Sequence, residues 1–246
     1  MPSAVPLPIS APHLNEGEVG VWITTLPKAK ARRAEAWSVI SQDEREHANR
    51  LVRDEDRALW IHTRAVLRCL LAGHLSIEPQ LIVFGEAPQG KPEVFEPSNM
   101  ERLDFSVSHS GEVAVITVAR DRRVGIDVER IQPDLSWEPI AKKLFSAADV
   151  AFIEGRPPAE RCLTFFDCWV RKESYLKGLG VGLKRALDGF SVPMGRAGGA
   201  VVDPGAHPLP GVEHRWRIHP IDVPDGYAAA LAIEGGCTIK TVTIPS

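Results

Sequence analysis

The stretch FFDCWVRKESYLKGLGVGL, residues 165–183, organises the rest of the chain. Trp169, Glu173 and Lys177 recur every fourth residue, so they share one face of a predicted helix. The opposite face is apolar, with Phe165, Phe166, Val170 and Leu176. Alone, Glu173 and Lys177 indicate a surface ion pair worth about 0.2–0.5 kcal/mol. A second acidic cluster upstream indicates that this polar face is part of a functional site.

The bulk composition is that of an ordinary globular protein. Its 246 residues, 44% hydrophobic and 25% charged, can bury a core as one large domain or two small ones. A net charge of −3 and a pI near 6.3 provide no broad basic surface for nucleic acid or an anionic membrane. The chain has no apolar run of transmembrane length and no secretory pattern in residues 1–14. We therefore expect a cytoplasmic protein whose four cysteines are free thiols.

Periodicity and turn residues predict an α+β fold. The predicted strands cover residues 19–24, 81–84, 105–108, 113–119, 124–129, 190–192, 215–221, 227–233 and 238–243. The predicted helices cover residues 31–50, 54–74 and 137–180. Ser41 is a candidate N-cap, and Ser146 with Asp149 forms a helix start signal. The order predicts two halves, 1–122 and 123–246, with the active site between them.

The second acidic cluster lies on one of the predicted strands. Asp127 and Glu129 are two residues apart, so their side chains project from the same face, while the alternating valine and isoleucine neighbours should bury the other. Adjacent like charges repel, which indicates either plain solvent exposure or a bound cation. With Glu173 as a third oxygen donor, the set suits Mg²⁺, which prefers oxygen ligands and is often shared with substrate phosphates.

Basic side chains surround these motifs in the sequence. They are Lys91, Lys172, Lys177 and the helix residues Arg57, Arg64 and Arg68. Lys91 lies in a Gly-Lys-Pro turn, which holds it on a constrained loop. The arginines alone indicate either an anion clamp or a solvated surface. Together with the carboxylates, these cations have the layout of phosphoryl-type transfer, where positioning and charge neutralisation do most of the work.

Two other motifs argue against familiar catalytic arrangements. Adjacent strand residues point to opposite faces, so His109 should not activate Ser108 as a nucleophile. A hydrogen bond to an anion suits these two residues better. Gly178, Gly180 and Gly182 lack the spacing of a Walker loop and follow a helix, which predicts a C-cap and turn.

Five motifs in order resemble the 4′-phosphopantetheinyl transferases. The two signature motifs are VGIDVE at 124–129 and WVRKESYLK at 169–177, and the supporting blocks are GKP at 90–92, FSVSHSG at 105–111 and GVGL…LDGFSV at 180–192. Motif separation and chain length are similar to the larger, surfactin-synthetase type. That type implies a monomeric pseudo-dimer: two similar α/β halves related by a pseudo-twofold axis, each a small, mostly antiparallel sheet packed with helices.

The resemblance implies an enzyme that transfers the 4′-phosphopantetheine moiety of coenzyme A to a serine of an acyl or peptidyl carrier protein. The reaction would need Mg²⁺, with Mn²⁺ as an alternative, and would release adenosine 3′,5′-bisphosphate. Carriers of fatty-acid, polyketide, non-ribosomal peptide and siderophore synthesis all fit. Acyl-CoA donors are also consistent with the sequence.

The motifs also carry implied residue roles. Asp127, Glu129 and Glu173 would hold Mg²⁺ against the pyrophosphate, and Glu173 would also be the base for the carrier serine, directly or through water. Lys177 would stabilise charge on the α-phosphate or leaving group. Lys172 would contact phosphate.

A second set of residues would hold the nucleotide end and its 3′-phosphate: Lys91, Ser108 and His109. The family usually places basic residues near the start of the helix that begins at Ser41, whereas this chain has Glu44 and His47. Protonated His47 could still serve, or Arg50 or Arg64 could substitute.

Two other functions are consistent with the same residues. A Mg²⁺-dependent phosphoanhydride hydrolase would use water as the nucleophile and cleave CoA without a protein acceptor. A non-catalytic CoA-binding module would tolerate Glu173→Gln without any change in ligand affinity. If the protein is a transferase, we expect the carrier to dock near an exposed segment around Lys142, Lys143 and Phe145.

Overall fold

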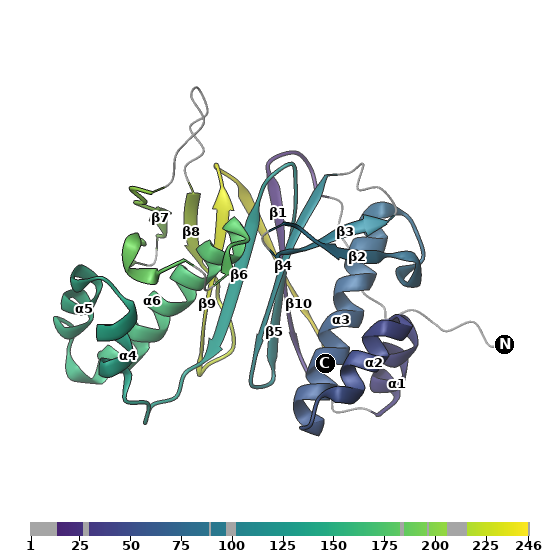
Figure 1. Cartoon of the computed structure of the whole chain (residues 1–246), viewed down its shortest axis with the longest axis horizontal. Helices are drawn as coiled ribbons and strands as arrows, with labels where there is room; N and C mark the ends of the chain where they lie inside the picture. The colour runs from purple at the N-terminus through teal and green to yellow at the C-terminus, as the bar shows by residue number, and fades with distance from the viewer. Residues whose placement is uncertain are drawn as a thin grey trace.

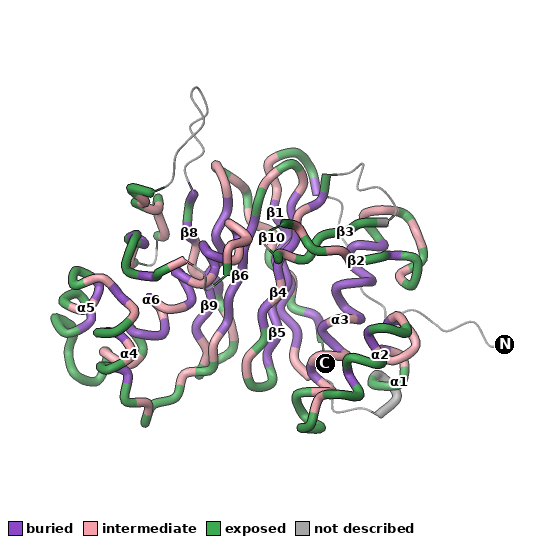
Figure 2. Tube along the Cα trace, viewed as in Figure 1, coloured by how far each residue is buried: buried purple, intermediate pink, exposed green. Residues whose placement is uncertain are grey.

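The computed structural model describes residues 14–26, 30–88, 90–96, 102–182, 185–195, 197–205 and 216–245. Its helices and strands form four layers, in which two sheets face each other and helices cover the outer face of each (Figure 1). Buried residues follow the strands and the inner faces of the helices, as Figure 2 shows in purple. The predicted α+β class is confirmed.

The first sheet has the strand order β10-β1-β5-β4. Its strands are β1 (Glu18–Thr25), β4 (Leu103–Ser110), β5 (Val113–Arg120) and β10 (Thr238–Ile244). Neighbouring strands run antiparallel except β1 and β10, which are parallel. The helices on its outer side are α1 (Lys30–Val39), α2 (Gln42–Arg50) and α3 (Asp54–Leu75). Leu67 and Leu70 of α3 pack on Trp22 of β1.

A short hairpin and turn complete the first half. The 3-10 turn η1 (Pro79–Leu81) leads from α3 into β2 (Val83–Glu86), which pairs antiparallel with β3 (Pro92–Glu96). The Gly-Lys-Pro turn predicted at 90–92 is part of the connection between these strands. Gly90 has a φ of 94°, a left-handed conformation that glycine adopts without steric cost.

The second sheet has the order β6-β9-β8-β7 and is antiparallel throughout. Its strands are β6 (Val124–Arg130), β7 (Gly199–Ala200), β8 (Trp216–Pro220) and β9 (Tyr227–Glu234). The helices on its outer side are α4 (Trp137–Leu144), α5 (Ala147–Glu154) and α6 (Pro158–Leu179), and the 3-10 turn η3 (Leu187–Gly189) follows them. The apolar face predicted for α6, residues 165, 166, 170 and 176, is buried.

A separate apolar layer fills the space between the two sheets. It includes Val19, Val21 and Ile23 of β1, Val113 and Val115 of β5, Val124, Ile126 and Val128 of β6, and Leu231 and Ile233 of β9. Burying each branched aliphatic side chain contributes about 1.5–3 kcal/mol, so this layer holds the sheets together. Because β6 alternates, its other face turns Asp127 and Glu129 away from this layer.

Helix α6 lies directly on β6 because two glycines meet there. A Cβ added to Gly125 would collide with the backbone of Ser174 and Gly178. The helix ends at Gly180, whose φ of 77° gives a left-handed C-cap, as the glycine spacing predicted. This close approach brings the polar face of α6 beside the acidic face of β6.

The edge strands of the two sheets, β4 and β6, lie side by side. Side chains of β4 take the place of a backbone ladder: the N–H groups of residues 124, 126 and 130 donate to Asp104 Oδ2, Ser106 Oγ and Ser110 Oγ at 2.8, 3.1 and 3.0 Å. We call this contact the β4–β6 seam. It covers two strand edges that would otherwise be open.

Several predicted elements are subdivided in the structure. The helical run 31–50 is two helices, because Ser41 and Glu44 form a capping box that starts α2. The run 137–180 is three helices, and Ser146 with Asp149 caps α5 as predicted. The strand expected at 81–84 is β2 at Val83–Glu86. Residues 190–192 contribute only an isolated bridge between Ser191 and Val202.

The last strand corrects the expected division at residue 122. β10 belongs by sequence to the second half, yet it pairs with β1 in the first sheet. Its Lys240 also forms an ion pair with Glu18 at 2.7 Å. The chain crosses back to the first sheet at its end. There β10 pairs with backbone N–H and C=O groups of β1 that would otherwise form an open sheet edge.

No helix in the described ranges is long and apolar enough to cross a membrane. The four cysteines are free thiols, as expected. Burial raises the pKa of Cys69 to about 11 and that of Cys168 to about 12. Both thiols are therefore held in the neutral, unreactive form.

Candidate active site

Asp127 lies at the β4–β6 seam and is 3% exposed. Its Oδ1 accepts hydrogen bonds from Lys177 Nζ of α6 at 2.6 Å and from Ser108 Oγ of β4 at 2.8 Å. Its Oδ2 is buried and has no hydrogen-bond partner among the described residues. A buried carboxylate oxygen with no partner is costly, which indicates that this atom faces a ligand position.

Glu173 has a second such oxygen. Its Oε1 is buried and lacks a hydrogen-bond partner in the described part of the chain. Burial, followed by the negative charge of Asp127, raises the pKa of Glu173 to about 7, and Lys177 opposes the shift. Burial also raises the pKa of Glu129, whose Oε2 accepts a hydrogen bond from Ser110 at 2.8 Å. The three predicted carboxylates therefore lie close enough for their charges to affect one another's pKa.

Lys177 joins α6 to both strands of the seam. Its Nζ donates to Asp127 Oδ1 and, at 2.8 Å, to Ser108 Oγ. Its side chain remains 31% exposed, so the ammonium is open to solvent on one side. The predicted grouping of α6, β6 and the FSVSHSG strand is thus present. Within the described ranges, however, no three His, Cys, Asp or Glu side chains already meet the geometry of a metal site.

A cavity of about 260 Å³ opens beside the cluster. It is lined by Arg64, Gly90, Lys91, Pro92, Phe105, Ser106, Val107, Lys177, Gly180 and Gly182. Its three cations come from three elements, and each has a carboxylate partner: Arg64 with Glu44, Lys91 with Asp104, and Lys177 with Asp127. The partners hold the cations in place around the cavity.

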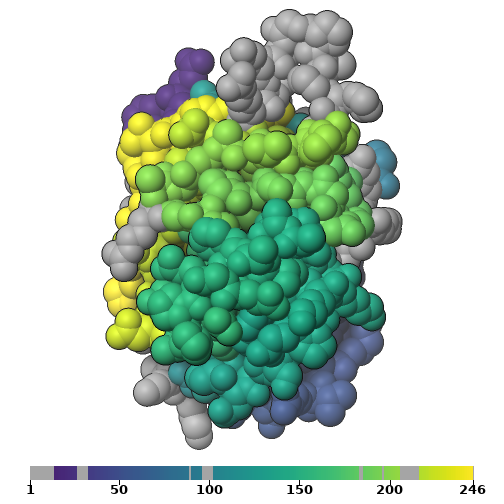
Figure 3. All heavy atoms as spheres, turned by 90° about the vertical axis from the view of Figure 1, so that its left-hand side faces the viewer, coloured from purple at the N-terminus to yellow at the C-terminus, as the bar shows by residue number. Residues whose placement is uncertain are grey.

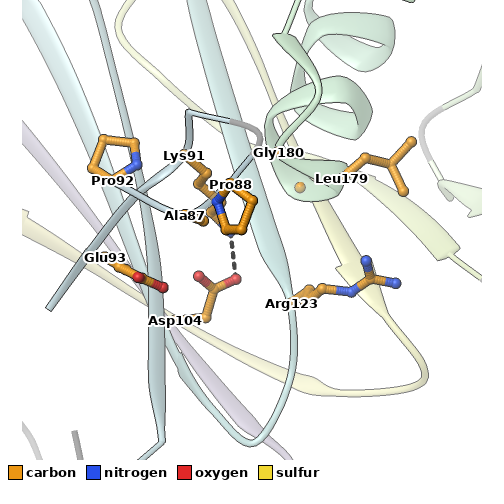
Figure 4. Close-up of a pocket in the computed structure, with 10 residues that line it drawn as sticks. Ala87, Pro88, Lys91, Pro92, Glu93, Asp104, Arg123, Leu179 and Gly180 are labelled. Atoms are coloured by element: carbon orange, nitrogen blue, oxygen red, sulfur yellow. Dashed lines mark hydrogen bonds and ion pairs between the residues drawn. The ribbon is translucent and has the colours of Figure 1, made fainter. Parts of the chain in front are cut away.

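Lys91 is fixed more firmly than the sequence indicated. Its Nζ donates to Asp104 Oδ2 at 2.5 Å and to the carbonyl of Val124 at 2.8 Å. Burial lowers its pKa, and Asp104 opposes that effect. Figure 4 shows the ion pair in an adjoining cavity of about 280 Å³, between the β2–β3 turn, the strands of the seam and the end of α6. Lys91 therefore holds the turn that lines both cavities.

Ser108 and His109 point to different surroundings, as strand alternation predicted. His109 lines a smaller cavity of about 200 Å³ with Trp60, Thr63, Arg64, Leu67 and Val107. Desolvation, followed by the charge of Lys177, lowers the pKa of His109. His47 is exposed, but its ring packs on Trp60 at 4.7 Å between centroids. The structure thus brings both His47 and His109 near Trp60.

Lys172 is a correction to the predicted site. It is 0% exposed, its Nζ donates to the carbonyls of Leu187 and Phe190 at 2.8 and 2.7 Å, and it pairs with Asp149 at 2.9 Å. All three ammonium donors are used, so Lys172 cannot contact a phosphate. Its role is to hold the residues after α6 and the start of α5 together. The neighbouring Glu173 lies about 100° further round the helix.

The helix arginines form an anion clamp, but its anion is within the protein. Arg64 and Arg68 both form ion pairs with Glu44, and Arg68 is 2% exposed. Burial alone would raise the pKa of Glu44, yet the hydrogen bond from Arg68 and the charge of Arg64 hold it below its ordinary value. Arg57 instead pairs with Asp54 at the surface. At a position where the family resemblance implies a basic residue, this chain thus has Glu44, which pairs with two arginines of its own fold.

The segment expected to dock a carrier is only partly exposed. Lys142 and Lys143 are exposed on α4, but Phe145 is 5% exposed and stacks on Phe165 in the core. Figure 3 shows the surface formed by this region in teal. The expected apolar contact at Phe145 is therefore wrong, because that ring packs inward beneath α6.

The polar side chains that build the seam were not predicted from the sequence. Asp104, Ser106 and Ser110 each contact β6. Their signal is the alternation of Asp and Ser at every second residue of a strand whose other side chains are largely apolar. Asp203 was also missed: it accepts a hydrogen bond from Tyr175 at 2.6 Å and pairs with Arg185. Asp203 thereby links the segment that follows β7 to the last turns of α6.

Comparison with known proteins identifies the family. Residues 123–232 match the model of the 4′-phosphopantetheinyl transferase superfamily, and residues 27–121 match the model described as 4′-phosphopantetheinyl transferase, N-terminal. The chain is 31% identical over 168 residues to 4′-phosphopantetheinyl transferase HetI of Nostoc sp., covering 68% of this chain and 71% of the relative. The chain belongs to the 4′-phosphopantetheinyl transferase superfamily.

Two further relatives support the assignment. 4′-Phosphopantetheinyl transferase Sfp of Bacillus subtilis is 29% identical over 194 residues, covering 79% of this chain and 82% of the relative. 4′-Phosphopantetheinyl transferase AcpT of Salmonella typhimurium is 35% identical over 124 residues, covering 50% of this chain and 59% of the relative. The predicted family is confirmed, and the chain is an enzyme of this class.

Proposed function

We propose that this transferase moves 4′-phosphopantetheine from coenzyme A to a serine of an acyl or peptidyl carrier protein at the β4–β6 seam. The observation that carries the proposal is the convergence of Asp127, Glu129, Glu173 and Lys177 beside a cavity lined by further cations. Acidic oxygens for a metal and lysines for phosphate are what a pyrophosphate donor requires.

The residues fit a divalent cation. Asp127 and Glu173 each present a buried oxygen without a hydrogen-bond partner in the described ranges, and Glu129 lies in the same field. Oxygen donors with room for water and phosphate suit Mg²⁺, and Mn²⁺ takes similar ligands. We propose these three as its ligands. When bound, the ion would neutralise charge on the pyrophosphate.

The chain's own side chains supply the remaining chemistry. The carrier serine oxygen attacks the phosphorus that bears pantetheine, the P–O bond to the nucleotide's phosphate breaks, and adenosine 3′,5′-bisphosphate leaves. Glu173, in its carboxylate form, accepts the serine proton directly or through a water. Lys177, held toward the cavity by Asp127 and Ser108, balances charge on the leaving phosphate.

The nucleotide end of CoA would occupy the cavities around Lys91 and His109. Arg64 lines both the larger cavity and the one that contains His109. We propose Ser108, His109, His47, Arg64 and the turn held by Lys91 as the contacts at this end. Glu44 supports this role indirectly, because it fixes Arg64 at the cavity wall.

We also infer that the two halves are related by an approximate twofold axis, as in a single-chain pseudo-dimer. Each half has a four-stranded sheet, and each sheet carries one helix of 22 residues, α3 or α6, on its outer face. A pseudo-dimer contains within one chain the interface that would otherwise join two subunits, so we propose a monomer.

We propose that the enzyme acts in the cytoplasm. Its free thiols suit a reducing compartment, and CoA is available there.

The test is intact-mass spectrometry of apo carrier proteins from several pathways, incubated with this enzyme, CoA and Mg²⁺. We expect an EDTA-sensitive gain of one phosphopantetheine group on at least one carrier and no gain with Glu173→Gln. Cleavage of CoA with no carrier gaining mass would instead identify the hydrolase. CoA binding that leaves both CoA and the carriers intact would identify a binding module.

A further inference from the structure

A row of polar side chains on β4 lies along the seam, and two of them contact the carboxylates of β6. Asp104, Ser106, Ser108 and Ser110 occupy alternate positions of β4, so all four project from one face. Two of them bond the predicted metal ligands: Ser108 Oγ donates to Asp127 Oδ1 and Ser110 Oγ donates to Glu129 Oε2, both at 2.8 Å. Ser108 also contacts Lys177.

Ser110 has a geometry that fixes the orientation of Glu129. Its hydroxyl accepts a hydrogen bond from Arg130 N at 3.0 Å, and its one proton goes to Glu129 Oε2. A hydroxyl that accepts on one side and donates on the other has little freedom to rotate. One oxygen of Glu129 is therefore tied to β4, and the carboxylate can offer the other to a cation.

We propose that Ser110 is a positioning residue for the divalent cation, acting through Glu129. The inference rests on the proposed function, because it assumes that Glu129 is a metal ligand. Side chains that orient metal ligands in this way commonly change metal affinity by about 10–100-fold when they are removed. Ser110 does not line the substrate cavity described above. Its partners are the Arg130 N–H and Glu129, and of these two only Glu129 is a proposed metal ligand.

Ser106 provides a matched control on the same strand face. Its Oγ accepts a hydrogen bond from Ile126 N at 3.1 Å in a buried position, so it contacts the β6 backbone where Ser110 contacts a carboxylate. Removing it should leave a buried N–H unsatisfied and cost stability. The bond from Arg130 N to Ser110 is exposed, so water can replace that donor's partner in Ser110→Ala.

The two substitutions should therefore change different properties. Ser110→Ala should weaken metal binding, and Ser106→Ala should lower stability. We would titrate the full-length protein with Mn²⁺ and count free Mn²⁺ by electron paramagnetic resonance, without CoA. Ser110→Ala should weaken Mn²⁺ binding about tenfold, and Ser110→Thr, which keeps the hydroxyl, should restore it. Ser106→Ala should bind Mn²⁺ as the wild type does, while unfolding at lower urea concentration than Ser110→Ala.

A second readout separates positioning from general damage. In the transfer assay, Ser110→Ala should raise the Mg²⁺ concentration needed for half-maximal rate about tenfold, while the KM for CoA at saturating Mg²⁺ stays near the wild-type value. Unchanged Mn²⁺ affinity in Ser110→Ala would overturn the positioning role and leave the metal site intact. Equal weakening by Ser106→Ala and Ser110→Ala would overturn it too, by pointing to a loosened seam. Wild-type protein that fails to bind Mn²⁺ saturably would overturn the metal site and the positioning role together.

Discussion

The charged residues of this site differ mainly in whether their oxygen or ammonium groups are already engaged by neighbouring side chains. Asp127 and Glu173 each keep one buried oxygen without a hydrogen-bond partner within the described residues, whereas Glu44 has both oxygens engaged. Lys177 and Lys172 lie five residues apart on one helix, yet one faces a cavity and the other is enclosed. Residue type alone could not separate these roles, because burial and partners decide them.

Replacing Lys172 or Lys177 by methionine should separate stability from catalysis. Lys172→Met leaves Asp149 buried without its cation, so we expect a loss of about 3–5 kcal/mol in unfolding free energy. Lys177→Met also removes the cation of a buried carboxylate, Asp127, but a divalent cation bound at the cluster would offset that charge, so with Mg²⁺ present we expect mainly a lower kcat. Urea unfolding and the carrier-transfer rate measure the two effects. A folded Lys172→Met with full stability and reduced affinity for CoA would contradict the reassignment of Lys172.

Glu44→Gln should destabilise the protein in a pH-dependent manner. Arg64 and Arg68 would lose their shared counter-charge, at a cost of about 3 kcal/mol near neutral pH. The folded-state pKa of Glu44 lies below its ordinary value of 4.5, so its contribution is present above pH 4.5 and is lost as pH falls through the folded pKa. Unfolding free energies of both proteins, measured from neutral pH down to about two units below the ordinary pKa of a glutamate, should therefore converge in acid. A gap that stays constant would contradict this role.

At the scale of elements, the close contact of α6 and β6 places Glu173 and Lys177 beside Asp127. The sequence predicted α6's polar and apolar faces, the acidic face of β6, and the cap at Gly180, because periodicity and glycine conformations are local properties. It did not predict Lys172's burial or the contacts of Asp104, Ser106 and Ser110, because these depend on which strands become neighbours. The same limit applies to β10, whose pairing with β1 spans the chain.

Gly125→Ala should disturb the site without touching a functional side chain. Its Cβ would collide with the α6 backbone at Ser174 and Gly178, and such overpacking costs about 1–3 kcal/mol. Because α6 must move away from β6, we expect kcat to fall more than stability explains. Gly189→Ala is the control, since a Cβ there meets nothing within 4 Å. Equal transfer rates in the two variants would show that helix placement is not critical.

The whole molecule is held together at the inter-sheet core, the β4–β6 seam and the return of β10 to the first sheet. Sequence order predicted two α+β halves with a site between them, and the carboxylates do lie where the edge strands of the two sheets meet. The exact division at residue 122 was not predictable from order alone. The last strand crosses back, and only its pairing with β1 reveals this.

Removing β10 should therefore destabilise the first sheet even though the predicted active site remains. Truncation after Gly236 would expose β1 as an open edge and uncover the apolar contacts of Ile244. We expect a lower unfolding midpoint and concentration-dependent aggregation by light scattering. Lys240→Met, which removes only the ion pair with Glu18, should have a much smaller effect. A truncated protein as stable as Lys240→Met would contradict a structural role for β10.

We propose that Asp127, Glu129 and Glu173 hold a divalent cation against the CoA pyrophosphate. The most direct test of this site is anomalous X-ray scattering from crystals grown with Mn²⁺ and CoA. We predict a single strong peak at coordination distance from Asp127 Oδ2, Glu129 and Glu173 Oε1, adjoining pyrophosphate density. A peak elsewhere, or CoA bound with no peak at this cluster in an enzyme that transfers phosphopantetheine, would contradict the claim.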